Sequence, residues 1–565
     1  MQARVSGGSR RLRLAIGAFL AGALSITALI GGHEPAVSTP VSPVAELVGG
    51  EPNIVEVMLD DMRADDLQWM PFTRTLMRTQ GLEFRNSFSN FPLCCPARAS
   101  FFSGQYTHNH RVLFHDGRYG YGAFDDRYTI ATSLKEAGYQ TGLVGKYLNL
   151  FGTQDTLVGS REAGHPVPSH SYVPHGWDDF RAGLSYNEVT RKANITNFFN
   201  TGYNINGTPT VYAGDYNTDT MSDFAVEMLR NFHENEQPFF VSLNYTAPHF
   251  ADPEPGDPHH VRRLNGSYYN FKTTQRPEWV RGRFDQRITH GQGMPRDGSQ
   301  PELDVSDKPV YFREYPNFSA EEMRAETEVT RQRAEALFVV DEQLRRLVLE
   351  LQAQGEWDNT VFMVTSDNGY LLGEHRVRQA KIRAHEPSLR VPFLVTGPGI
   401  RQGERRYDPI TTVDVTRTIL ALAGARSPHP ADGFSRVPTM LDGDRGWLTP
   451  VVTEGYHTGS GAFDTGLSSI GVRTPRYSFI NYAEGIDELY DLKVDPFQNA
   501  NKIRNPAYDA IEKRLRALSW RLHTCAGAEC RIALPSQFAT TPGTTRTLTE
   551  GYWSAIQRRY GYGAR

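Results

Sequence analysis

Carboxylate and amide side chains follow two apolar runs of this 565-residue sequence, at the points where the runs end. One run ends at Leu59, directly before Asp60 and Asp61, and a later run ends just before Asp367 and Asn368. Taken singly, such residues after a strand are ordinary turn or helix-cap residues. Together they form an oxygen-only ligand set, which favours Ca²⁺ or Mg²⁺ over zinc, and the amide suits the looser shell of Ca²⁺. The four residues therefore predict a divalent-cation site.

Side chains that carry positive charge or a transferable proton are the second group of candidates. They are Arg98, Lys146, His249 and Lys381. A lone lysine after glycine is usually solvated, and a lone histidine after Ala-Pro is more often structural, so none of them is specific alone. Around a divalent cation, however, these side chains would stabilise a tetrahedral oxyanion ester, which is a sulfate or a phosphate.

The chain has four cysteines, and two of them are neighbours. Cys94 and Cys95 are a poor disulfide pair, because adjacent residues need a strained turn to reach disulfide geometry. Without further context they are interpreted as two buried core cysteines. Cys525 and Cys530, in the segment CAGAEC, are predicted to pair if the protein is exported to an oxidising compartment.

The apolar runs predict the elements that must position the candidate residues. Runs such as 54–59, 239–243 and 361–365 are almost continuously apolar, as expected for strands buried on both faces of a parallel sheet. Helical patterns lie between them, and the clearest spans 333–355 with Gly355 as its stop. The predicted fold class is α/β, with a mostly parallel central sheet sandwiched by helices. In such sheets ligands bind at the carboxyl ends of the strands, which is where several candidate residues lie.

Charge and the N-terminal segment limit the function classes. The formal net charge of −4 and the pI of about 6.5 give no support for nucleic-acid binding. Arginines precede an uncharged run from Leu14 to Ile30, which predicts an export signal cleaved near 30–36, or else a short membrane anchor. The segment SRRLRL partly resembles a twin-arginine export signal. The protein is therefore predicted to be secreted or associated with the cell envelope, and bound to a membrane only if this segment is retained.

The same patterns predict the domain organisation. The expected parts are a signal peptide or anchor at 1–35, a linker at 36–49, a catalytic domain at 50–445, a smaller C-terminal α+β subdomain at 446–530 and a loop-rich tail at 531–565. Within the catalytic domain, residues 251–320 have weak periodicity, which predicts long loops. Their histidines and arginines either bind a polyanionic glycan or are solvated surface side chains.

Several short motifs, in their order along the chain, resemble those of the sulfatase family. CCPAR matches the family signature Cys-x-Pro-x-Arg, and its companions are LDDM, GKYLN, APHF, TSDNG and RQAKIRAHEPSLRVPFLVTGPG. The later segment ELYDLKVDPFQNANK resembles the start of the family's C-terminal subdomain. The likeness covers roughly residues 50–515 and is greatest to the N-acetylglucosamine-6-sulfatases and related glycosaminoglycan sulfatases. It implies an alkaline-phosphatase-like fold.

The resemblance also implies a modification and a reaction. In the family the first signature cysteine, Cys94 here, is oxidised to Cα-formylglycine by a formylglycine-generating enzyme, and it joins the metal ligands. One hydroxyl of the hydrated aldehyde attacks the sulfur of a sulfate monoester, and the second later expels sulfate from the sulfated enzyme. The resemblance implies that Arg98 orients the hydrate and that Lys146 and Lys381 hold the sulfate oxygens. His249, or a lysine, protonates the leaving sugar oxygen.

Two departures from the family pattern, and two other functions, remain open at this point. Leu148 stands where many arylsulfatases have a histidine, and Ala97 stands where serine is common. The expected substrate is a sulfated carbohydrate of the N-acetylglucosamine-6-sulfate type. The alternatives are a phosphodiester or phosphonate monoester hydrolase of the same superfamily, and a secreted glycan-binding protein without catalysis.

Overall fold

A computed structural model describes residues 50–427, 429–457 and 461–563. The predicted signal or anchor at 1–35 and the linker at 36–49 lie outside the described residues. Within the described part of the chain, no helix is both long and apolar enough to cross a membrane. The described residues all fall in one compact unit.

A ten-stranded sheet forms the centre of the fold, in the order β12-β2-β11-β10-β1-β7-β3-β4-β5-β6. In chain order the strands are β1 (Asn53–Leu59), β2 (Gly81–Phe88), β3 (Gln140–Lys146), β4 (Asp179–Gly183), β5 (Asn200–Ile205), β6 (Thr208–Ala213), β7 (Phe239–Asn244), β10 (Thr360–Ser366), β11 (Phe393–Thr396) and β12 (Glu404–Thr411). Strands β10, β1, β7, β3 and β4 run parallel, while β11, β5 and β6 pair antiparallel with their neighbours. The predicted mostly parallel central sheet is confirmed.

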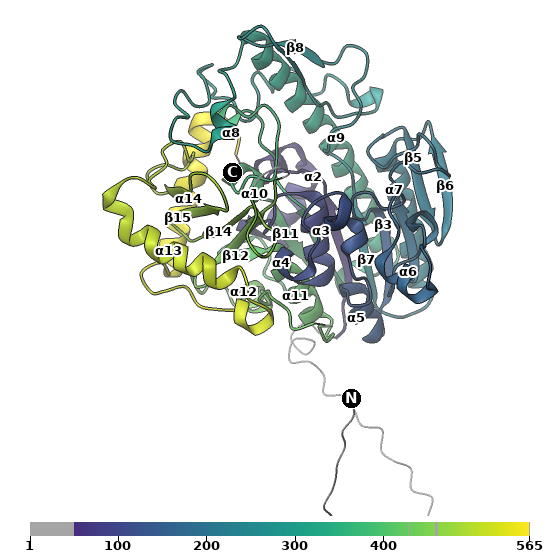
Figure 1. Ribbon diagram of the computed structural model, residues 1–565. Coiled ribbons are helices and arrows are strands. Elements are labelled where there is room, and N and C mark those ends of the chain that lie inside the picture. The colour runs from purple at the N-terminus through teal and green to yellow at the C-terminus, as the bar shows by residue number, and fades with distance from the viewer. Residues whose placement is uncertain (1–49, 428, 458–460, 564–565) are drawn as a thin grey trace, which may run out of the picture. The chain divides into compact units, whose positions relative to one another are not determined.

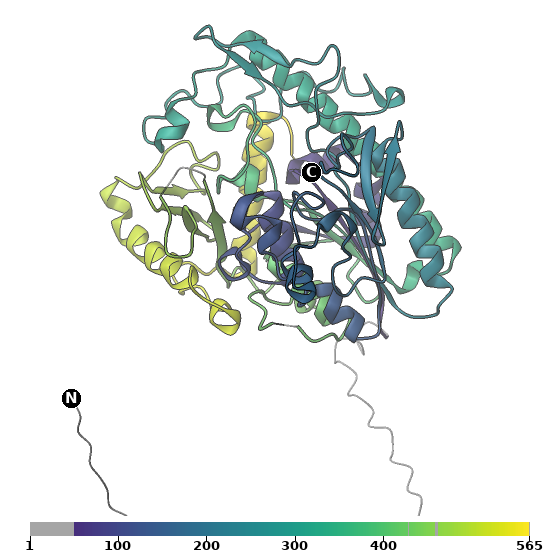
Figure 2. The same ribbon diagram turned by 45° about the vertical axis from the view of Figure 1, so that its right-hand side comes forward.

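Helices cover both faces of this sheet (Figures 1 and 2). Alternate residues of β1 show why its sequence is almost continuously apolar: Val55 and Val57 belong to one apolar core, and Ile54 and Met58 to another. The first core includes residues of α2 (Pro71–Gln80), α7 (Asn217–His233), α9 (Ala320–Ala353) and α14 (Pro542–Tyr560). The second core includes residues of α3 (Cys94–Ser103), α5 (Ile130–Glu136), α11 (Thr412–Leu422) and α12 (Val437–Leu441).

Helix α9 contains the clearest helical pattern of the sequence. Ser319 caps its first turn, because its side chain accepts a hydrogen bond from the Glu322 amide and Glu322 bonds back to the Ser319 amide. Leu337, Leu344 and Leu351 are buried, as the apolar stripe predicts. The helix starts earlier than the predicted pattern and ends at Ala353. Gly355 follows with a left-handed φ of 76°, a conformation that glycine adopts without strain.

The C-terminal part of the chain forms the predicted smaller α+β subdomain. Its antiparallel sheet consists of β13 (Val451–Gly455), β14 (Ser469–Arg473), β15 (Tyr477–Tyr482) and β16 (Glu488–Asp491). Helix α13 (Asp509–Leu522) packs on this sheet through Leu515, Leu518 and Leu522.

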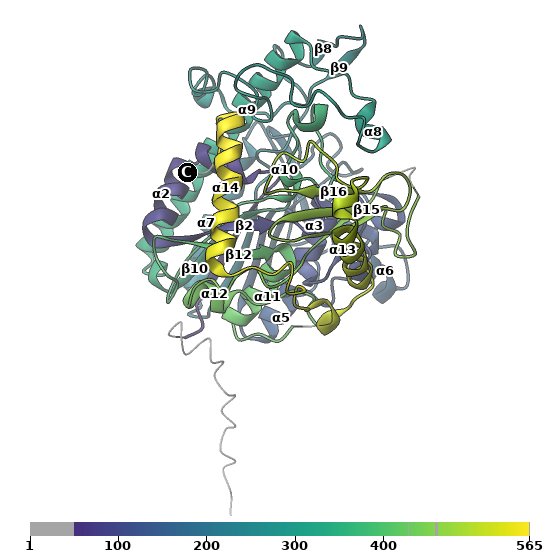
Figure 3. The same cartoon turned by 90° about the vertical axis from the view of Figure 1, so that its left-hand side faces the viewer.

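The prediction of a loop-rich tail at 531–565 is wrong for much of that range, because α14 occupies Pro542–Tyr560. Thr541 caps the helix and a proline begins it. Tyr552, Trp553 and Ile556 pack into the first core of the central sheet rather than onto the C-terminal sheet. Figure 3 shows α14, in yellow, near α2 and the strands β2 and β12. Its apolar residues occupy one stripe at helical spacing, which is the signal that sequence analysis overlooked.

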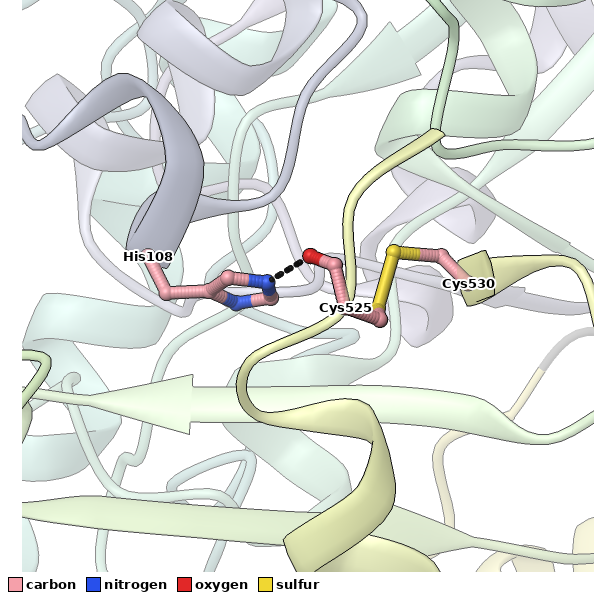
Figure 4. Close-up of side chains that lie close together, drawn as sticks. All are labelled: His108, Cys525 and Cys530. Carbon is pink, nitrogen blue, oxygen red and sulfur yellow. Dashed lines mark hydrogen bonds between the residues drawn. A yellow bond between two sulfur atoms is a disulfide. The ribbon is translucent and has the colours of Figure 1, made fainter. Parts of the chain in front are cut away.

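The disulfide between Cys525 and Cys530 is present, as predicted. Figure 4 shows His108, on α4 (Thr107–His110), beside it: the ring Nε2 lies 2.7 Å from the backbone oxygen of Cys525. The other ring nitrogen contacts the Glu454 carboxylate on β13. Burial opposes charge on this histidine, but Glu454 raises its pKa above the ordinary value. The segment that follows α3 is therefore tied to the C-terminal subdomain by charge as well as by packing.

Residues 251–320 form long connections with little regular structure. The short elements there are β8 (His260–Arg262), β9 (Tyr268–Asn270) and α8 (Val310–Arg313). Other short helices of the chain are α6 (Leu157–Ala163) and α10 (Glu386–Leu389). Of the basic residues considered for glycan binding, Arg281 is paired with Glu254 at 2.9 Å, and Arg263 lies 3.6 Å from Glu322. These ion pairs favour a structural role for both arginines.

Candidate active site

The predicted acidic residues meet at the carboxyl ends of neighbouring parallel strands. Leu59 at the end of β1 pairs with Ser366 at the end of β10. The residues that follow are therefore adjacent, and carboxylate oxygens of Asp60, Asp61 and Asp367 lie within 4.8 Å of one another. All three side chains are buried.

Cys94 is the first residue of α3 and faces this acidic cluster. Its Sγ lies 3.3 Å from Asp60 Oδ1 and 3.9 Å from Asp61 Oδ1. Burial, with the charge of Asp60, raises the pKa of the Cys94 thiol well above its ordinary value. Cys95 turns the other way and packs into the second core, under the sheet. Adjacent cysteines on one helix thus have separate environments, and only Cys94 belongs to the site.

Arg98, one helical turn after Cys94, connects three strand ends. Its Nε donates to Asp367 Oδ2 at 2.8 Å, and its Nη1 donates to the Lys146 backbone oxygen at 2.7 Å and to Asn244 Oδ1 at 3.0 Å. The side chain is fully buried. Burial and the charge of Asp60 raise the pKa of Asp367 to about 6, while Arg98 opposes that rise. The arginine therefore keeps the acidic cluster in register across the sheet.

The two lysines approach the cluster from different segments. Lys146, at the end of β3, contacts Asp60. Lys381, on the loop before α10, donates from Nζ to Asp61 Oδ1 at 2.5 Å and to Cys94 Sγ at 2.7 Å. Burial opposes charge on both lysines, yet Asp60 raises the pKa of Lys146 and Asp61 raises that of Lys381. Both ammonium groups are therefore charged. Lys381 contacts the Cys94 side chain directly, and Lys146 contacts Asp60, which lies beside Cys94.

His249 follows β7 and completes the predicted set. Its Nδ1 donates to the Phe250 backbone oxygen at 2.7 Å, so Nε2 carries no proton when the ring is neutral. That Nε2 lies 3.7 Å from Asp61 Oδ2. Burial lowers the pKa of the ring to about 4, although Asp60 and Asp61 oppose this. The structure thus brings every sequence-predicted site residue into one cluster, with a neutral histidine at its edge.

Two buried oxygens in the cluster are suited to a cation. Asp61 Oδ2 and Asn368 Oδ1 have no hydrogen-bond partner among the described residues. The amide group of Asn368 donates to Asp61 Oδ1 at 2.6 Å and to the Gly369 oxygen at 2.8 Å, so its own oxygen is left for another ligand. Buried polar atoms are normally satisfied. Two unsatisfied oxygens beside two further carboxylates therefore match the ligand chemistry of Ca²⁺ or Mg²⁺.

Several residues that shape this site were not predicted from the sequence. Arg333 on α9 donates to the Asp61 backbone oxygen at 2.7 Å and to Asp66 at 2.8 Å. It thereby supports Asp61, whose φ of 66° is in the left-handed region. An arginine beside the apolar stripe of α9 was a usable signal. Asn244 gave none, because it is a single polar residue outside any matched motif.

Family models identify the chain. The model described as Sulfatase matches residues 52–425, and one described as N-sulphoglucosamine sulphohydrolase, C-terminal, matches residues 373–524. The first match covers more than half of the chain, so the protein belongs to the sulfatase family. It is a sulfuric ester hydrolase, and the alternative of a glycan-binding protein without catalysis is not supported. Sulfatases generally use a formylglycine and a divalent metal, and the acidic cluster could hold such a metal.

Curated relatives agree with this family. An arylsulfatase of Volvox carteri is 29% identical over 522 residues, covering 85% of this chain and 75% of the relative. The human N-acetylglucosamine-6-sulfatase is 26% identical over 525 residues, covering 85% and 86%. An extracellular sulfatase SULF-1 homolog of Drosophila melanogaster is 30% identical over 407 residues, which is 70% of this chain but only 32% of that relative.

Solved structures share the fold. A protein in complex with its substrate D-glucosamine-2-N,6-O-disulfate has a TM-score of 0.58 at 21% identity, covering 83% of this chain and 97% of that one. A phosphonate monoester hydrolase of Silicibacter pomeroyi also has a TM-score of 0.58 at 21% identity, covering 87% and 99%. At this identity the two likenesses establish the fold and leave the substrate open.

Proposed function

We propose that the protein hydrolyses carbohydrate sulfate monoesters of the N-acetylglucosamine-6-sulfate type, with Cys94 as the precursor of a formylglycine nucleophile. The observation that carries this proposal is the position of Cys94 Sγ, 3.3 Å from Asp60 and 2.7 Å from the Lys381 ammonium. A nucleophile formed there would lie between acidic cation ligands and a charged lysine, which is the environment that a sulfate ester requires.

The residues of the chain can be assigned separate roles. Asp60, Asp61, Asp367, Asn368 and the modified Cys94 would hold Ca²⁺, or Mg²⁺, which supplies positive charge for the sulfate oxygens. The two lysine ammonium groups would hold the remaining sulfate oxygens. Arg98 makes hydrogen bonds to Asp367 and Asn244, so it positions the cluster. His249 lies at the edge of the cluster, where it could protonate the leaving oxygen.

The substrate class rests on two similarities. Human N-acetylglucosamine-6-sulfatase is one of the relatives that match over most of both chains, and one structural neighbour binds a sulfated glucosamine. The proposed partners are therefore a sulfated carbohydrate and, during maturation, a formylglycine-generating enzyme. Export is proposed from the N-terminal sequence, and two relatives are named extracellular sulfatases.

Initial rates on two esters of the same phenol separate the proposal from its main alternative. We expect nitrophenyl sulfate to be hydrolysed faster than a nitrophenyl phosphonate or phosphodiester, and we expect release of sulfate from N-acetylglucosamine-6-sulfate. Because the substrates release the same nitrophenolate, a difference in rate reports only on the sulfate or phosphorus group that is attacked. A preference for the phosphorus ester would assign the protein to the phosphonate or phosphodiester hydrolases, and stable N-acetylglucosamine-6-sulfate would contradict the proposed sugar.

Removal of divalent cations should abolish turnover. Chelation followed by dialysis is expected to inactivate the enzyme, and Ca²⁺ or Mg²⁺ should restore it, because both cations accept oxygen-only ligands. Asp367→Asn removes one formal charge from the cluster and should raise the Ca²⁺ concentration needed for half-maximal activity. Ca²⁺ binding measured directly by calorimetry gives a readout that is independent of turnover. An active preparation that contains stoichiometric zinc, without calcium or magnesium, would contradict the assignment.

A further inference from the structure

A polar cavity lies apart from the catalytic residues. It has a volume of about 560 Å³ and is bordered by α2, α14 and the first residues of β2 and β12. Four arginines line it, and we call it the arginine pocket. They are Arg74, Arg78, Arg405 and Arg546. Its volume lies within the usual range of small-ligand sites, about 300–1,000 Å³.

The central sheet separates the arginine pocket from the active site. Helix α2 belongs to the first core, whereas α3, which begins with Cys94, packs into the second core on the other face. Within the sheet, β2 is the third strand from β1, or about 14 Å at the usual strand spacing. Through the strand register, Glu83 of β2 is level with Val57, which precedes Asp60 by three residues. The pocket is therefore not an extension of the catalytic cluster.

The three glutamates that line the pocket already have partners. Glu83 accepts from Arg85 at 2.6 Å and from Arg405 at 3.2 Å. Glu404 accepts from Arg406 at 2.5 Å. Glu550 accepts the hydroxyl proton of a neighbouring tyrosine at 2.6 Å. Arginines thus match the charges of Glu83 and Glu404, and Glu550 is hydrogen-bonded.

The positive charge is not matched in the same way. Among the described residues, the guanidinium groups of Arg74, Arg78 and Arg546 form neither an ion pair nor a hydrogen bond, and Arg546 lies over the ring of Tyr407, 5.5 Å from its centroid. Burial lowers the pKa of Arg74, and the charges of Arg78, Arg287 and Arg405 lower it further, while the charge of Glu83 opposes this. Like charges held close together are unfavourable unless an anion lies between them. Guanidinium groups bind tetrahedral oxyanions through paired hydrogen bonds.

We propose that the arginine pocket is a second binding site for the sulfate groups of a glycan chain, remote from the point of hydrolysis. The ligand class rests on the proposed function, because a sulfated carbohydrate is the anion that the enzyme must encounter. Such a site would hold a long sulfated chain to the enzyme while the active site acts on one terminal or internal ester. It would have no effect on a single sulfated sugar, which occupies only the active site.

The test compares a sulfated octasaccharide with a monosaccharide. Arg74→Ala/Arg78→Ala removes two unpaired charges of the pocket. Arg324→Ala/Arg514→Ala is the matched control, because both of these arginines are exposed helical residues elsewhere. Binding of a heparin-derived octasaccharide to the full chain, in a Cys94→Ala background, should weaken roughly two- to thirtyfold in the pocket variant, as expected for the loss of two surface charges. Hydrolysis of N-acetylglucosamine-6-sulfate by the pocket variant with Cys94 intact should be unchanged.

Each other outcome counts against the proposal. If the pocket variant and the control weaken octasaccharide binding equally, the effect is one of general charge, and the proposal is overturned. Sodium sulfate that displaces the octasaccharide at an equal concentration of sulfate groups would assign the pocket to the free ion instead. If the pocket variant on α2 lowers the melting temperature, Arg546→Gln on α14 tests the same pocket from a different helix. Octasaccharide binding that depends on Arg74, together with stable N-acetylglucosamine-6-sulfate, would refute the proposed substrate and leave the pocket intact.

Discussion

The Cys94→Ala variant is expected to have no measurable sulfatase turnover, because the side chain that faces the acidic cluster would lose its reactive atom. Mature wild-type protein should carry a peptide around Cys94 that is lighter than the unmodified sequence by about 18 Da, the loss expected on conversion of cysteine to formylglycine. Peptide mass spectrometry and steady-state rates on nitrophenyl sulfate measure both effects.

Cys95 provides the matched control for this experiment. It is also fully buried, but it packs into the second core rather than toward the acids. Cys95→Ser should therefore leave most of the turnover and only lower the melting temperature, since a hydroxyl replaces an apolar contact. Fully active protein in which Cys94 is an unmodified thiol would contradict the proposed nucleophile.

The His249→Ala variant is expected to lose far more activity on N-acetylglucosamine-6-sulfate than on nitrophenyl sulfate. A sugar alkoxide is a poor leaving group and needs a proton, whereas nitrophenolate hardly does. General acid catalysis contributes about 10²–10⁴-fold, so the two losses should differ by up to that factor. Equal losses would instead show that the histidine holds the sulfate or the cation ligands, and the donor role would pass to Lys381 or Lys146.

The pH dependence of the wild-type enzyme provides a second measurement of the same role. In the free enzyme the pKa of His249 is about 4, so the fraction of ring that carries a donatable proton falls as the pH rises above that value. For the sugar sulfate, kcat/KM should therefore decline with rising pH along this limb. Nitrophenyl sulfate should lack the decline, as should both substrates with His249→Ala. The negative charge of a bound sulfate ester favours the imidazolium form of His249, so the ring should keep its proton to higher pH in the enzyme–substrate complex. The decline of kcat should therefore begin at a higher pH than the decline of kcat/KM.

Residues at strand ends were the part of the site that could be predicted from the sequence. Asp60 and Asp367 follow apolar runs that had to be buried strands, and parallel strands bring their carboxyl ends together. Cys94 could be placed through its motif alone. Asn244 could not, because its hydrogen bond to Arg98 depends on which strand lies beside which. The sheet order places β1 between β7 and β10, and that order is set by packing of the whole chain.

The prediction of a loop-rich tail at 531–565 was wrong for a related reason. The stretch from Pro542 to Tyr560 has four aromatic or aliphatic residues in one stripe, but glycine and several threonines lower its helix propensity. Contact with the central sheet stabilises the helix, and such contact is invisible to a local reading of the sequence. The fold class was easier to predict, since long apolar runs separated by helical patterns admit few arrangements.

The order of the strands also determines when the site can close during synthesis. Strand β1 lies between β7 and β10, which are made much later, and Lys381 follows Cys94 by 287 residues along the chain. At about 5–20 residues per second, a ribosome needs roughly 15–60 s to cover that distance. During this interval Cys94, which is fully buried in the finished protein, has neither Asp367, which follows β10, nor its lysine partner Lys381. The cysteine is therefore not yet enclosed while this part of the chain is being made, which is the interval in which the proposed modifying enzyme would have to act before the sheet closes.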